Sequence, residues 1–201
     1  MKKGKARKVL VGPQRRPVYI FSDGSCDPDE RSKFGIKAGY GTVLYDPETD
    51  SGEAFGSYLD EKLIEILSDG GTKRQIVGQS ELVPCVAAKV LWKKKLRGRL
   101  VMHYVDNEAA KYGLIKGSSP TRGSAWLINE FRRWVADQES FTWFERVPSA
   151  SNCAGDPSRG KGRDTVVNGR KVAWRRMLDS IEKNLAESWA VQAADELGVV
   201  R

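Results

Sequence analysis

Three short runs of apolar residues stand near the start of the chain, each bounded by polar residues. Residues 18–22, 39–45 and 53–59 are rich in β-branched and aromatic side chains, a composition typical of strands. The second and third runs are separated by residues 46–52, where Asp, Pro, Ser and Gly indicate a turn. We therefore expect three strands that form an antiparallel meander.

Further along the chain, apolar side chains recur at helical spacing. Residues 80–96 predict a helix with Ser80 as its cap. Pro84 would then come so early that its missing N–H removes at most the first intrahelical bond. Residues 60–78 mix polar and apolar side chains, and the pattern supports either a short helix or a strand, followed by a loop.

The later segments alternate between strand and helix patterns. They predict a buried strand at 100–105, helices at 109–116 and 124–138, a strand at 141–147, a loop at 160–169 and a last helix at 173–197. Three meander strands followed by strands joined through helices indicate an α/β fold. We expect a mixed five-stranded sheet, made of the meander plus parallel strands, with helices on both faces.

The length and charge of the chain indicate one domain with basic extensions. The 201 residues, 40% of them hydrophobic, suffice for one buried core. We expect a basic flexible tail at 1–16, the domain at 17–160, and a basic loop and C-terminal helix at 161–201 that pack on it. The net charge of +8 comes largely from the tail. Such segments attract phosphate backbones, although a solvated tail without function explains the charge equally well.

The cysteines and the apolar runs bear on the compartment. Cys26, Cys85 and Cys153 show no C-x-x-C spacing, so neither a disulfide framework nor a zinc site is indicated. No apolar run approaches the ~18 residues that a membrane-spanning helix needs. We expect an intracellular protein, cytoplasmic or nuclear, without a membrane partner.

Four acids carry the candidate chemistry. Asp23 and Asp106 each follow a predicted strand, Glu81 opens the helix at 80–96, and Asp156 lies near the end of the domain. If the strands are neighbours, these carboxylates converge at one region of the sheet. Oxygen ligands without histidine or thiolate suit Mg²⁺ or Mn²⁺, and the matching chemistry is two-metal hydrolysis of a phosphodiester. Ordinary acids at strand and helix ends remain the alternative.

The order of several short motifs along the chain is similar to their order in a known family, although no single motif is specific. The motifs are Asp23-Gly24-Ser25, Gly39-Tyr40-Gly41, Gln79-Ser80-Glu81-Leu82, Asp106-Asn107-Glu108-Ala109-Ala110, Lys116-Gly117-Ser118, Val147-Pro148-Ser149, Asn152-Cys153-Ala154 and Pro157-Ser158-Arg159. Over roughly residues 18–160 this order resembles the ribonuclease H fold. Within it, the chain is most similar to the ribonuclease H-like domains of retroelement reverse transcriptases, especially of DIRS-type elements.

The resemblance implies a catalytic role for each acid. Asp23 would bridge two Mg²⁺ ions, Glu81 and Asp106 would each complete one, and Asp156 would hold the ion that activates water. Members of the family cut the RNA strand of an RNA–DNA hybrid and leave a 3′-hydroxyl and a 5′-phosphate. The implied partners are therefore an RNA–DNA hybrid and a reverse transcriptase polymerase domain.

The chain departs from the family pattern at the fourth acid. The pattern is Asn-x-Ala-Asp-x-x-Ser-Arg, and Gly155 stands where the aspartate belongs, with Asp156 one place later. A shift of one residue at a helix entry rotates a side chain by ~100°. Gly155 can adopt backbone conformations that turn Asp156 back toward the site; three carboxylates with a weak second metal are the other outcome.

Other polar residues near the acids are candidates for contacts with nucleic acid. Ser25 and Asn107 could touch phosphate or a sugar hydroxyl, but capping is an equal explanation for both. Arg159, Lys161 and Arg163 follow the predicted active-site edge and are expected to bind a phosphate backbone.

The histidine and the aromatic residues are interpreted as parts of the core. By strand alternation His103 points away from Asp106, so we do not expect it to act as a general base. Trp126, Trp134, Trp143 and Phe144 could stack on bases, but their spacing favours burial.

We therefore predict a ribonuclease H-like endonuclease acting on RNA–DNA hybrids. The alternative is a nucleic-acid-binding or scaffold domain that keeps the fold and has lost cleavage, which Gly155 favours. A DEDD-type exonuclease is disfavoured because Asp23 is followed by Gly24-Ser25 rather than by x-Glu. A transposase or integrase core is disfavoured by the ending Pro157-Ser158-Arg159.

Overall fold

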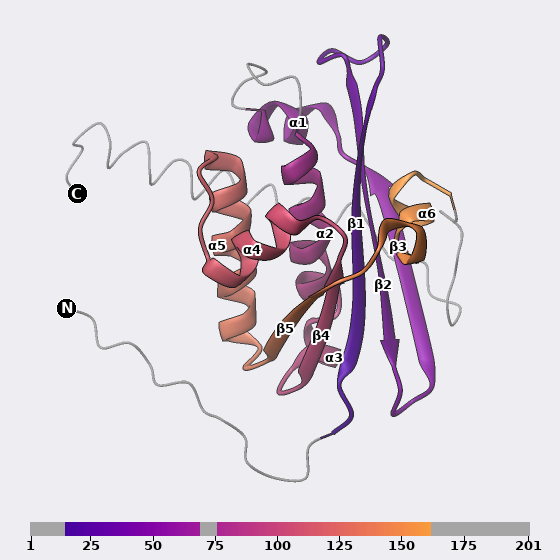
Figure 1. The fold of residues 1–201 in the computed structure, drawn as a ribbon, viewed down its shortest axis with the longest axis vertical. Coiled ribbons are helices and arrows are strands. Elements are labelled where there is room, and N and C mark those ends of the chain that lie inside the picture. The colour runs from indigo at the N-terminus through magenta and orange to yellow at the C-terminus, as the bar shows by residue number, and fades with distance from the viewer. Residues whose placement is uncertain (1–14, 69–75, 162–201) are drawn as a thin grey trace, which may run out of the picture.

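A five-stranded mixed sheet in the order β3-β2-β1-β4-β5 forms the frame of the fold (Figure 1). The elements are β1 Val18–Pro28, β2 Ile36–Asp46, β3 Ser51–Tyr58, α1 Glu61–Leu67, α2 Val77–Leu91, α3 Lys93–Leu96, β4 Leu100–Val105, α4 Glu108–Lys116, α5 Arg122–Asp137, β5 Phe141–Arg146, the 3₁₀ turn η1 Ser149–Ser151 and α6 Gly155–Ser158. The first three strands pair antiparallel, while β4 is parallel to β1 and to β5. The predicted meander with added parallel strands is confirmed.

The computed structural model describes residues 15–68 and 76–161. The predicted tail, except for its last two residues, and the predicted helix at 173–197 lie outside these residues. So do most of the loop predicted at 160–169 and part of the unassigned stretch after β3. Among the described helices, none is long and apolar enough to span a membrane.

Helices cover both faces of the sheet, as predicted. The helices α2, α4 and α5 lie on one side, and the short α6 lies on the other, over β1, β2 and β3 (Figure 1). Glycines in the sheet allow α6 to come this close: a Cβ at Gly41 or Gly56 would overlap the backbone of Pro157 or Ser158. The segment that contains the fourth-acid position is therefore held against the strand that carries Asp23.

Strand β1 is longer than the sequence predicts. The prediction ended it at Ser22 because Asp23-Gly24-Ser25 has the composition of a turn. In the structure β1 continues to Pro28, which pairs with Ile36 of β2. The polar residues remain in the strand because α2 packs on one side of them and α6 on the other.

The predicted helix at 80–96 is correct in type and wrong at both ends. Helix α2 begins three residues earlier and ends at Leu91, before the separate short helix α3. Pro84 consequently lies inside α2, where it cannot donate a hydrogen bond to the carbonyl of Ser80. The expectation that Pro84 occupies the helix start is therefore wrong, and the sequence signal failed because the polar and glycine residues before Ser80 are also helical.

The stretch that the sequence left unassigned after β3 begins with helix α1. Asp60 caps this helix, since its Oδ1 accepts a hydrogen bond from the Leu63 backbone N–H at 2.7 Å. Leu63, Ile64 and Leu67 are buried. The cap and the apolar side chains at helical spacing together account for the helix.

The core lies between the sheet and the helices α2 and α5, and it encloses several polar side chains. Lys89 is fully buried, and its Nζ donates to Thr142 Oγ1 at 2.8 Å. Burial lowers the pKa of Lys89 to about 7. His103 is also fully buried, and its Nε2 lies 2.7 Å from the hydroxyl of Ser22.

Candidate active site

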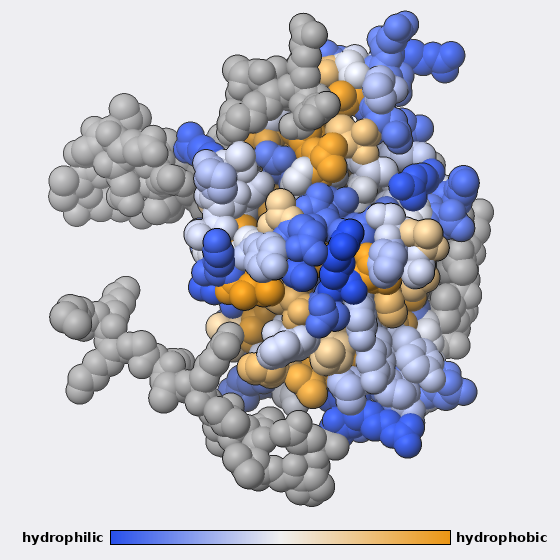
Figure 2. All heavy atoms as spheres, in the orientation of Figure 1, coloured by the Kyte–Doolittle hydropathy of each residue, from blue (hydrophilic) through white to orange (hydrophobic). Residues whose placement is uncertain are grey.

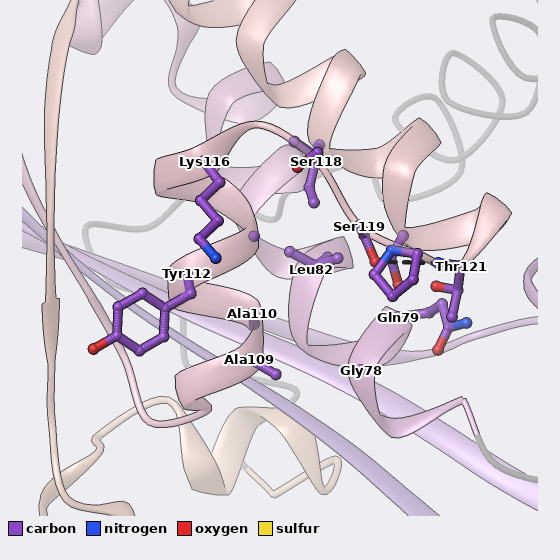
Figure 3. Close-up of a pocket in the computed structure, with 14 residues that line it drawn as sticks. Gly78, Gln79, Leu82, Ala109, Ala110, Tyr112, Lys116, Ser118, Ser119 and Thr121 are labelled. Atoms are coloured by element: carbon purple, nitrogen blue, oxygen red, sulfur yellow. Dashed lines mark hydrogen bonds between the residues drawn. The ribbon is translucent and has the colours of Figure 1, made fainter.

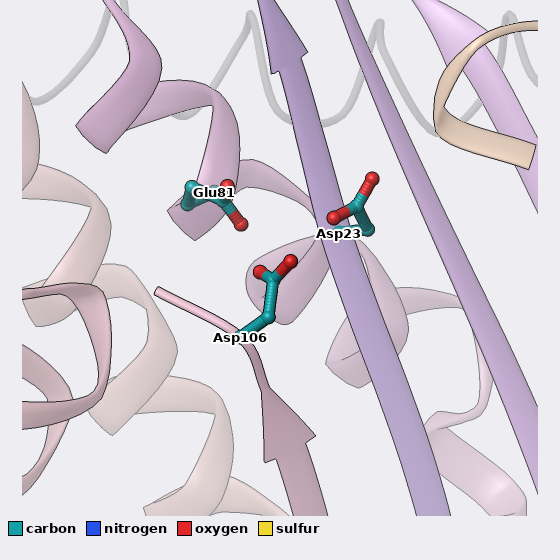
Figure 4. Close-up of side chains that lie close together, drawn as sticks. All are labelled: Asp23, Glu81 and Asp106. Atoms are coloured by element: carbon teal, nitrogen blue, oxygen red, sulfur yellow. The ribbon is translucent and has the colours of Figure 1, made fainter. Parts of the chain in front are cut away.

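Three of the four predicted acids converge in the structure. Asp23 comes from the middle of β1, Glu81 from the beginning of α2, and Asp106 directly follows β4. Their carboxylate groups point toward one another (Figure 4), and one oxygen from each lies within 4.8 Å of the others. The parallel pairing of β1 and β4 places Asp106 beside Asp23, and the packing of α2 on β1 adds Glu81.

Burial and mutual repulsion oppose the ionisation of these acids. Asp23 and Glu81 are only 3% and 6% exposed. Burial raises the pKa of Glu81 to about 8, with a further contribution from the negative charges of Asp106 and Asp23. Burial also raises the pKa of Asp23. A nearby cation would reverse this effect, because an opposite charge stabilises the ionised carboxylate.

The oxygen atoms of the cluster are only partly satisfied by the described part of the protein. Glu81 Oε2 accepts a hydrogen bond from the Gly24 backbone N–H at 3.1 Å, and Asp23 accepts one from the hydroxyl of Ser158. Asp106 Oδ1 is buried, and no described residue donates to it. An all-oxygen donor set with an unpartnered buried oxygen fits a hard divalent cation such as Mg²⁺ or Mn²⁺.

The fourth predicted acid does not join the cluster. The side chain of Asp156 is 77% exposed, and its Oδ1 lies 4.0 Å from Lys161 Nζ. Position 155, by contrast, faces the cluster, because a Cβ there would lie 4.0 Å from Asp23 Oδ2. The glycine does not turn Asp156 back toward the other carboxylates.

The predicted phosphate-binding residues lie at different distances from the cluster. Arg159 Nη1 is 3.8 Å from Asp23 Oδ2, while the side chain remains 54% exposed. Lys161 is exposed beside Asp156. Arg163 lies outside the described residues.

Ser25 and Asn107 both make structural hydrogen bonds. The hydroxyl of Ser25 donates to the Ser158 backbone carbonyl at 2.8 Å and so fastens α6 to β1. Asn107 Oδ1 accepts from the Ala110 backbone N–H at 2.9 Å and caps α4. Capping, which the sequence left as an alternative for both residues, is present for Asn107 and wrong for Ser25, which lies inside β1. Contact with nucleic acid stays a prediction for both residues.

The interpretation of His103 as a core residue is confirmed, and the same interpretation is wrong for Trp143. His103 packs against Phe131 and Phe144 on the helical side of the sheet. Trp143 is 54% exposed. The two differ because β5 is an edge strand whose alternate side chains face the side opposite α5. Trp126, Trp134 and Phe144 pack against the core while remaining partly exposed, in line with the prediction.

Two residues near the cluster were not predicted to have a role there. Asn152 donates through Nδ2 to the Ser22 backbone carbonyl at 3.0 Å, which ties the chain before α6 to β1. Ser158 donates to Asp23. Both belong to the short motifs on which the resemblance to the ribonuclease H fold rests, so their spacing was a usable signal. The motifs did not reveal which groups the two side chains contact.

A hollow lies next to the start of α2, the helix that carries Glu81. It has a volume of about 740 Å³ and is enclosed by the start of α2, by α4 and by the loop that precedes α5 (Figure 3). Leu82 and Ala110 contribute to its apolar wall, and Lys116, Ser119 and Thr121 contribute polar groups. Figure 2 shows hydrophilic side chains gathered across the middle of this face of the molecule, over α4 and the segment that leads from β5 to α6.

Comparisons with known proteins support the fold. No family model and no curated protein matches the sequence. LC11-RNase H1, isolated from compost by a metagenomic approach, matches with a TM-score of 0.56 and 15% identity over 75% of this chain and 98% of that chain. RNase H1 from the archaeon Halobacterium salinarum NRC-1 matches with a TM-score of 0.52 and 14% identity over 71% and 94% of the two chains.

Two further matches are complexes with nucleic acid. One is LC11-RNase H1 with an RNA/DNA hybrid, with a TM-score of 0.54 and 15% identity over 74% of this chain and 99% of that chain. The other is the foamy viral protease-reverse transcriptase with dsDNA, with a TM-score of 0.50 and 13% identity over 74% and 95%. The chain therefore has the ribonuclease H-like fold, while the particular likeness to DIRS-type domains stays a prediction.

Proposed function

We propose that this ribonuclease H-like domain is a metal-dependent nuclease that hydrolyses the RNA strand of RNA–DNA hybrids. The convergence of Asp23, Glu81 and Asp106 carries the proposal. These carboxylates are held close together on three separate elements, although burial and repulsion raise the pKa of Glu81 to about 8. An arrangement that costs stability in this way is typical of a functional site.

The three acids would hold a divalent cation, Mg²⁺ or Mn²⁺. Such an ion supplies positive charge to the phosphate and lowers the pKa of bound water. The sequence led us to expect two ions and four carboxylate ligands. With Asp156 exposed, the described residues provide three of those four ligands.

The substrate is proposed on two grounds. The first is the motif order, which resembles that of domains that cut the RNA strand of hybrids. The second is that LC11-RNase H1, whose fold this chain shares, has a structure in complex with an RNA/DNA hybrid. The polar groups of the hollow at the start of α2, including Lys116 and Ser119, are suitable donors to the phosphates of a bound strand. A reverse transcriptase polymerase domain remains the proposed protein partner.

The second candidate function is a binding or scaffold domain without cleavage. Gly155 favours it, because the position that faces Asp23 has no side chain to contribute a ligand. The two functions differ in what they require of the cluster: cleavage needs the carboxylates, whereas binding of a hybrid does not.

The experiment that separates them is cleavage of a hybrid labelled on its RNA strand, in Mg²⁺ and then in Mn²⁺. We expect RNA-strand cleavage by the wild-type chain and a loss of about 100-fold or more in Asp23→Asn, because the variant removes a central ligand and electrostatic stabilisation of this kind is worth that much. Binding measured in parallel by fluorescence anisotropy should change little. Intact binding with no cleavage in either metal would favour the scaffold function.

A further inference from the structure

A guanidinium group stands beside Asp23 where the family pattern places a fourth carboxylate. A Cβ at position 155 would lie 4.0 Å from Asp23 Oδ2 and only 3.0 Å from Nη1 of Arg159. The space into which a side chain at 155 would extend is therefore bordered by Arg159. Position 155 therefore contributes no anionic group, and the cationic Arg159, which the family pattern also contains, lies within reach of Asp23.

Local contacts hold Arg159 in this position. Its Nη1 donates to the Gly155 backbone carbonyl at 2.9 Å, and its own backbone carbonyl accepts from the hydroxyl of Tyr58 at 2.7 Å. The guanidinium lies 3.8 Å from Asp23 Oδ2, and 54% of the side chain is exposed. One end of the group thus faces the carboxylates, and the rest can meet a ligand from solvent.

Charge balance favours this arrangement over two divalent cations. Fully ionised, the carboxylates of Asp23, Glu81 and Asp106 carry three negative charges. One divalent cation and the guanidinium of Arg159 balance them. A second divalent cation would have to bind next to Arg159 and without a ligand from position 155, so it would meet repulsion and lack a carboxylate.

We propose that the site binds one divalent cation and that Arg159 acts as a catalytic residue in place of a second cation. This proposal rests on the proposed nuclease function. The cation would be held by Asp23, Glu81 and Asp106. Arg159 would contact the non-bridging oxygens of the scissile phosphate. A planar guanidinium suits this contact, because it can donate two parallel hydrogen bonds to a phosphate.

The reaction at the phosphate is a hydrolysis. The oxygen of a water molecule forms a bond to phosphorus, and the bond between phosphorus and the 3′ oxygen breaks. One proton of that water ends on the departing 3′ oxygen, which becomes the 3′-hydroxyl, and the other goes to the 5′-phosphate or to solvent. Arg159 transfers no proton, and its charge stabilises the negative charge that develops on the phosphate oxygens.

The number of bound ions can be measured without any reference to activity. We would titrate the full chain with Mn²⁺ and follow free Mn²⁺ by electron paramagnetic resonance. Wild type should bind one Mn²⁺ per chain, and so should Arg159→Gln. The double variant Gly155→Asp with Arg159→Gln should bind two, because it restores the carboxylate and removes the competing charge. Two Mn²⁺ ions on the wild type would overturn the inference.

Cleavage of the labelled hybrid tests the catalytic role. Arg159→Gln should lose about 100-fold in rate, the scale expected for removing a group that stabilises transition-state charge, while Arg159→Lys should recover part of the loss. Arg133→Gln is the matched control, because Arg133 is a similarly exposed arginine that pairs with Glu130 on α5, a helix that contributes no residue to the cluster. It should cleave like wild type.

The possible failures are distinguishable. If the cleavage rate of Arg159→Gln is within a few-fold of the rate of Arg133→Gln, the catalytic role of Arg159 is overturned and the proposed nuclease function stands. A wild-type chain that does not cleave in Mg²⁺ or Mn²⁺ would overturn the proposed function, and the catalytic role of Arg159 with it. Thermal unfolding of each variant excludes misfolding as the cause.

Discussion

Glu81 occupies a site that opposes its own ionisation. It is 6% exposed, and among the described residues only the Gly24 backbone N–H donates a hydrogen bond to its carboxylate. Burial and the neighbouring negative charges raise its pKa from the ordinary 4.5 to about 8. Without a cation, part of the cluster is therefore protonated at neutral pH, and metal binding should release protons.

The pKa of Glu81 predicts how the stability of the metal-free protein depends on pH. Between pH 4.5 and 8 the folded chain holds a proton on Glu81 that the unfolded chain has released, so the free energy of unfolding falls as pH rises through this window. Glu81→Gln should remove that fall. In a chelating buffer, the variant and wild type should have the same free energy of unfolding near pH 5. Near pH 8 the free energy of unfolding of the variant should be higher by roughly 4 kcal/mol.

Urea unfolding at several pH values measures this difference. The matched control is Glu65→Gln, which changes a half-exposed acid on α1 that pairs with Lys33. The free energy of unfolding of this variant should differ from that of wild type by the same amount at every pH in this range. Saturating Mg²⁺ should stabilise wild type more than Glu81→Gln, because only the wild type has all three ligands. A stability difference for Glu81→Gln that does not vary with pH would contradict the prediction.

At the scale of elements, the approach of α2 to β1 decides whether the acids meet. Gly24 lies where the two elements touch, and a Cβ there would overlap the backbone of Ser80 and Glu81. The absence of a side chain lets the start of α2 lie directly on β1. The same contact places the Gly24 N–H within hydrogen-bond distance of Glu81.

Gly24→Ala should therefore both destabilise the fold and displace Glu81. We expect a loss of about 3 kcal/mol in the free energy of unfolding, at the upper end of the range for overpacking, because the clash involves backbone that cannot rotate away. Gly78→Ala is the matched control on α2: a Cβ there meets nothing within 4 Å, so stability should be unchanged or raised by up to about 1 kcal/mol. Equal effects of the two variants in urea unfolding would refute the role of this contact.

At the scale of the whole molecule, the last two residues of the basic segment, Arg15 and Arg16, are held at the end of the sheet where β1 begins. The side chain of Arg15 pairs with Glu48, and the backbone carbonyl of Arg16 accepts from Arg99, at the end of the sheet where β1 begins. The Arg99 side chain also pairs with Asp46. Residues 1–14, which contain five Lys or Arg and no acid, thus join the domain at the end where β1 begins, whereas Asp23 lies in the middle of that strand.

Deletion of residues 1–14 separates the two explanations of this charge. If the segment contacts phosphates, the deletion should weaken hybrid binding and reduce the slope of log affinity against log salt concentration by about 1 to 4, since each lost contact changes it by about 0.9. Thermal stability and the cleavage rate at saturating hybrid should not change. An unaltered salt slope, measured by anisotropy from low to high salt, would identify the segment as a solvated tail.

The sequence by itself determined the kinds of elements, their order and three members of the site. Apolar runs of strand length and helical spacing reflect which faces must be buried, so they predicted the five-stranded sheet and most helices. Asp23 and Asp106 were predictable because one lies on a strand and the other directly follows one, and the parallel pairing of β1 and β4 puts them side by side. Glu81 followed from its place at the start of an apolar helix that must pack on the sheet.

Only the tertiary structure decided the contacts that depend on direction and on neighbours. Consecutive residues at the start of a helix point in directions that differ by about 100° about the helix axis. That rotation decides whether position 155 or 156 faces Asp23, and both residues fit the same local sequence pattern. The use of Ser25 to hold α6, the place of Pro84 inside α2 and the exposure of Trp143 likewise depend on what packs against each residue. The approach of Arg159 to Asp23 belongs here too, because it joins residues that are far apart along the chain.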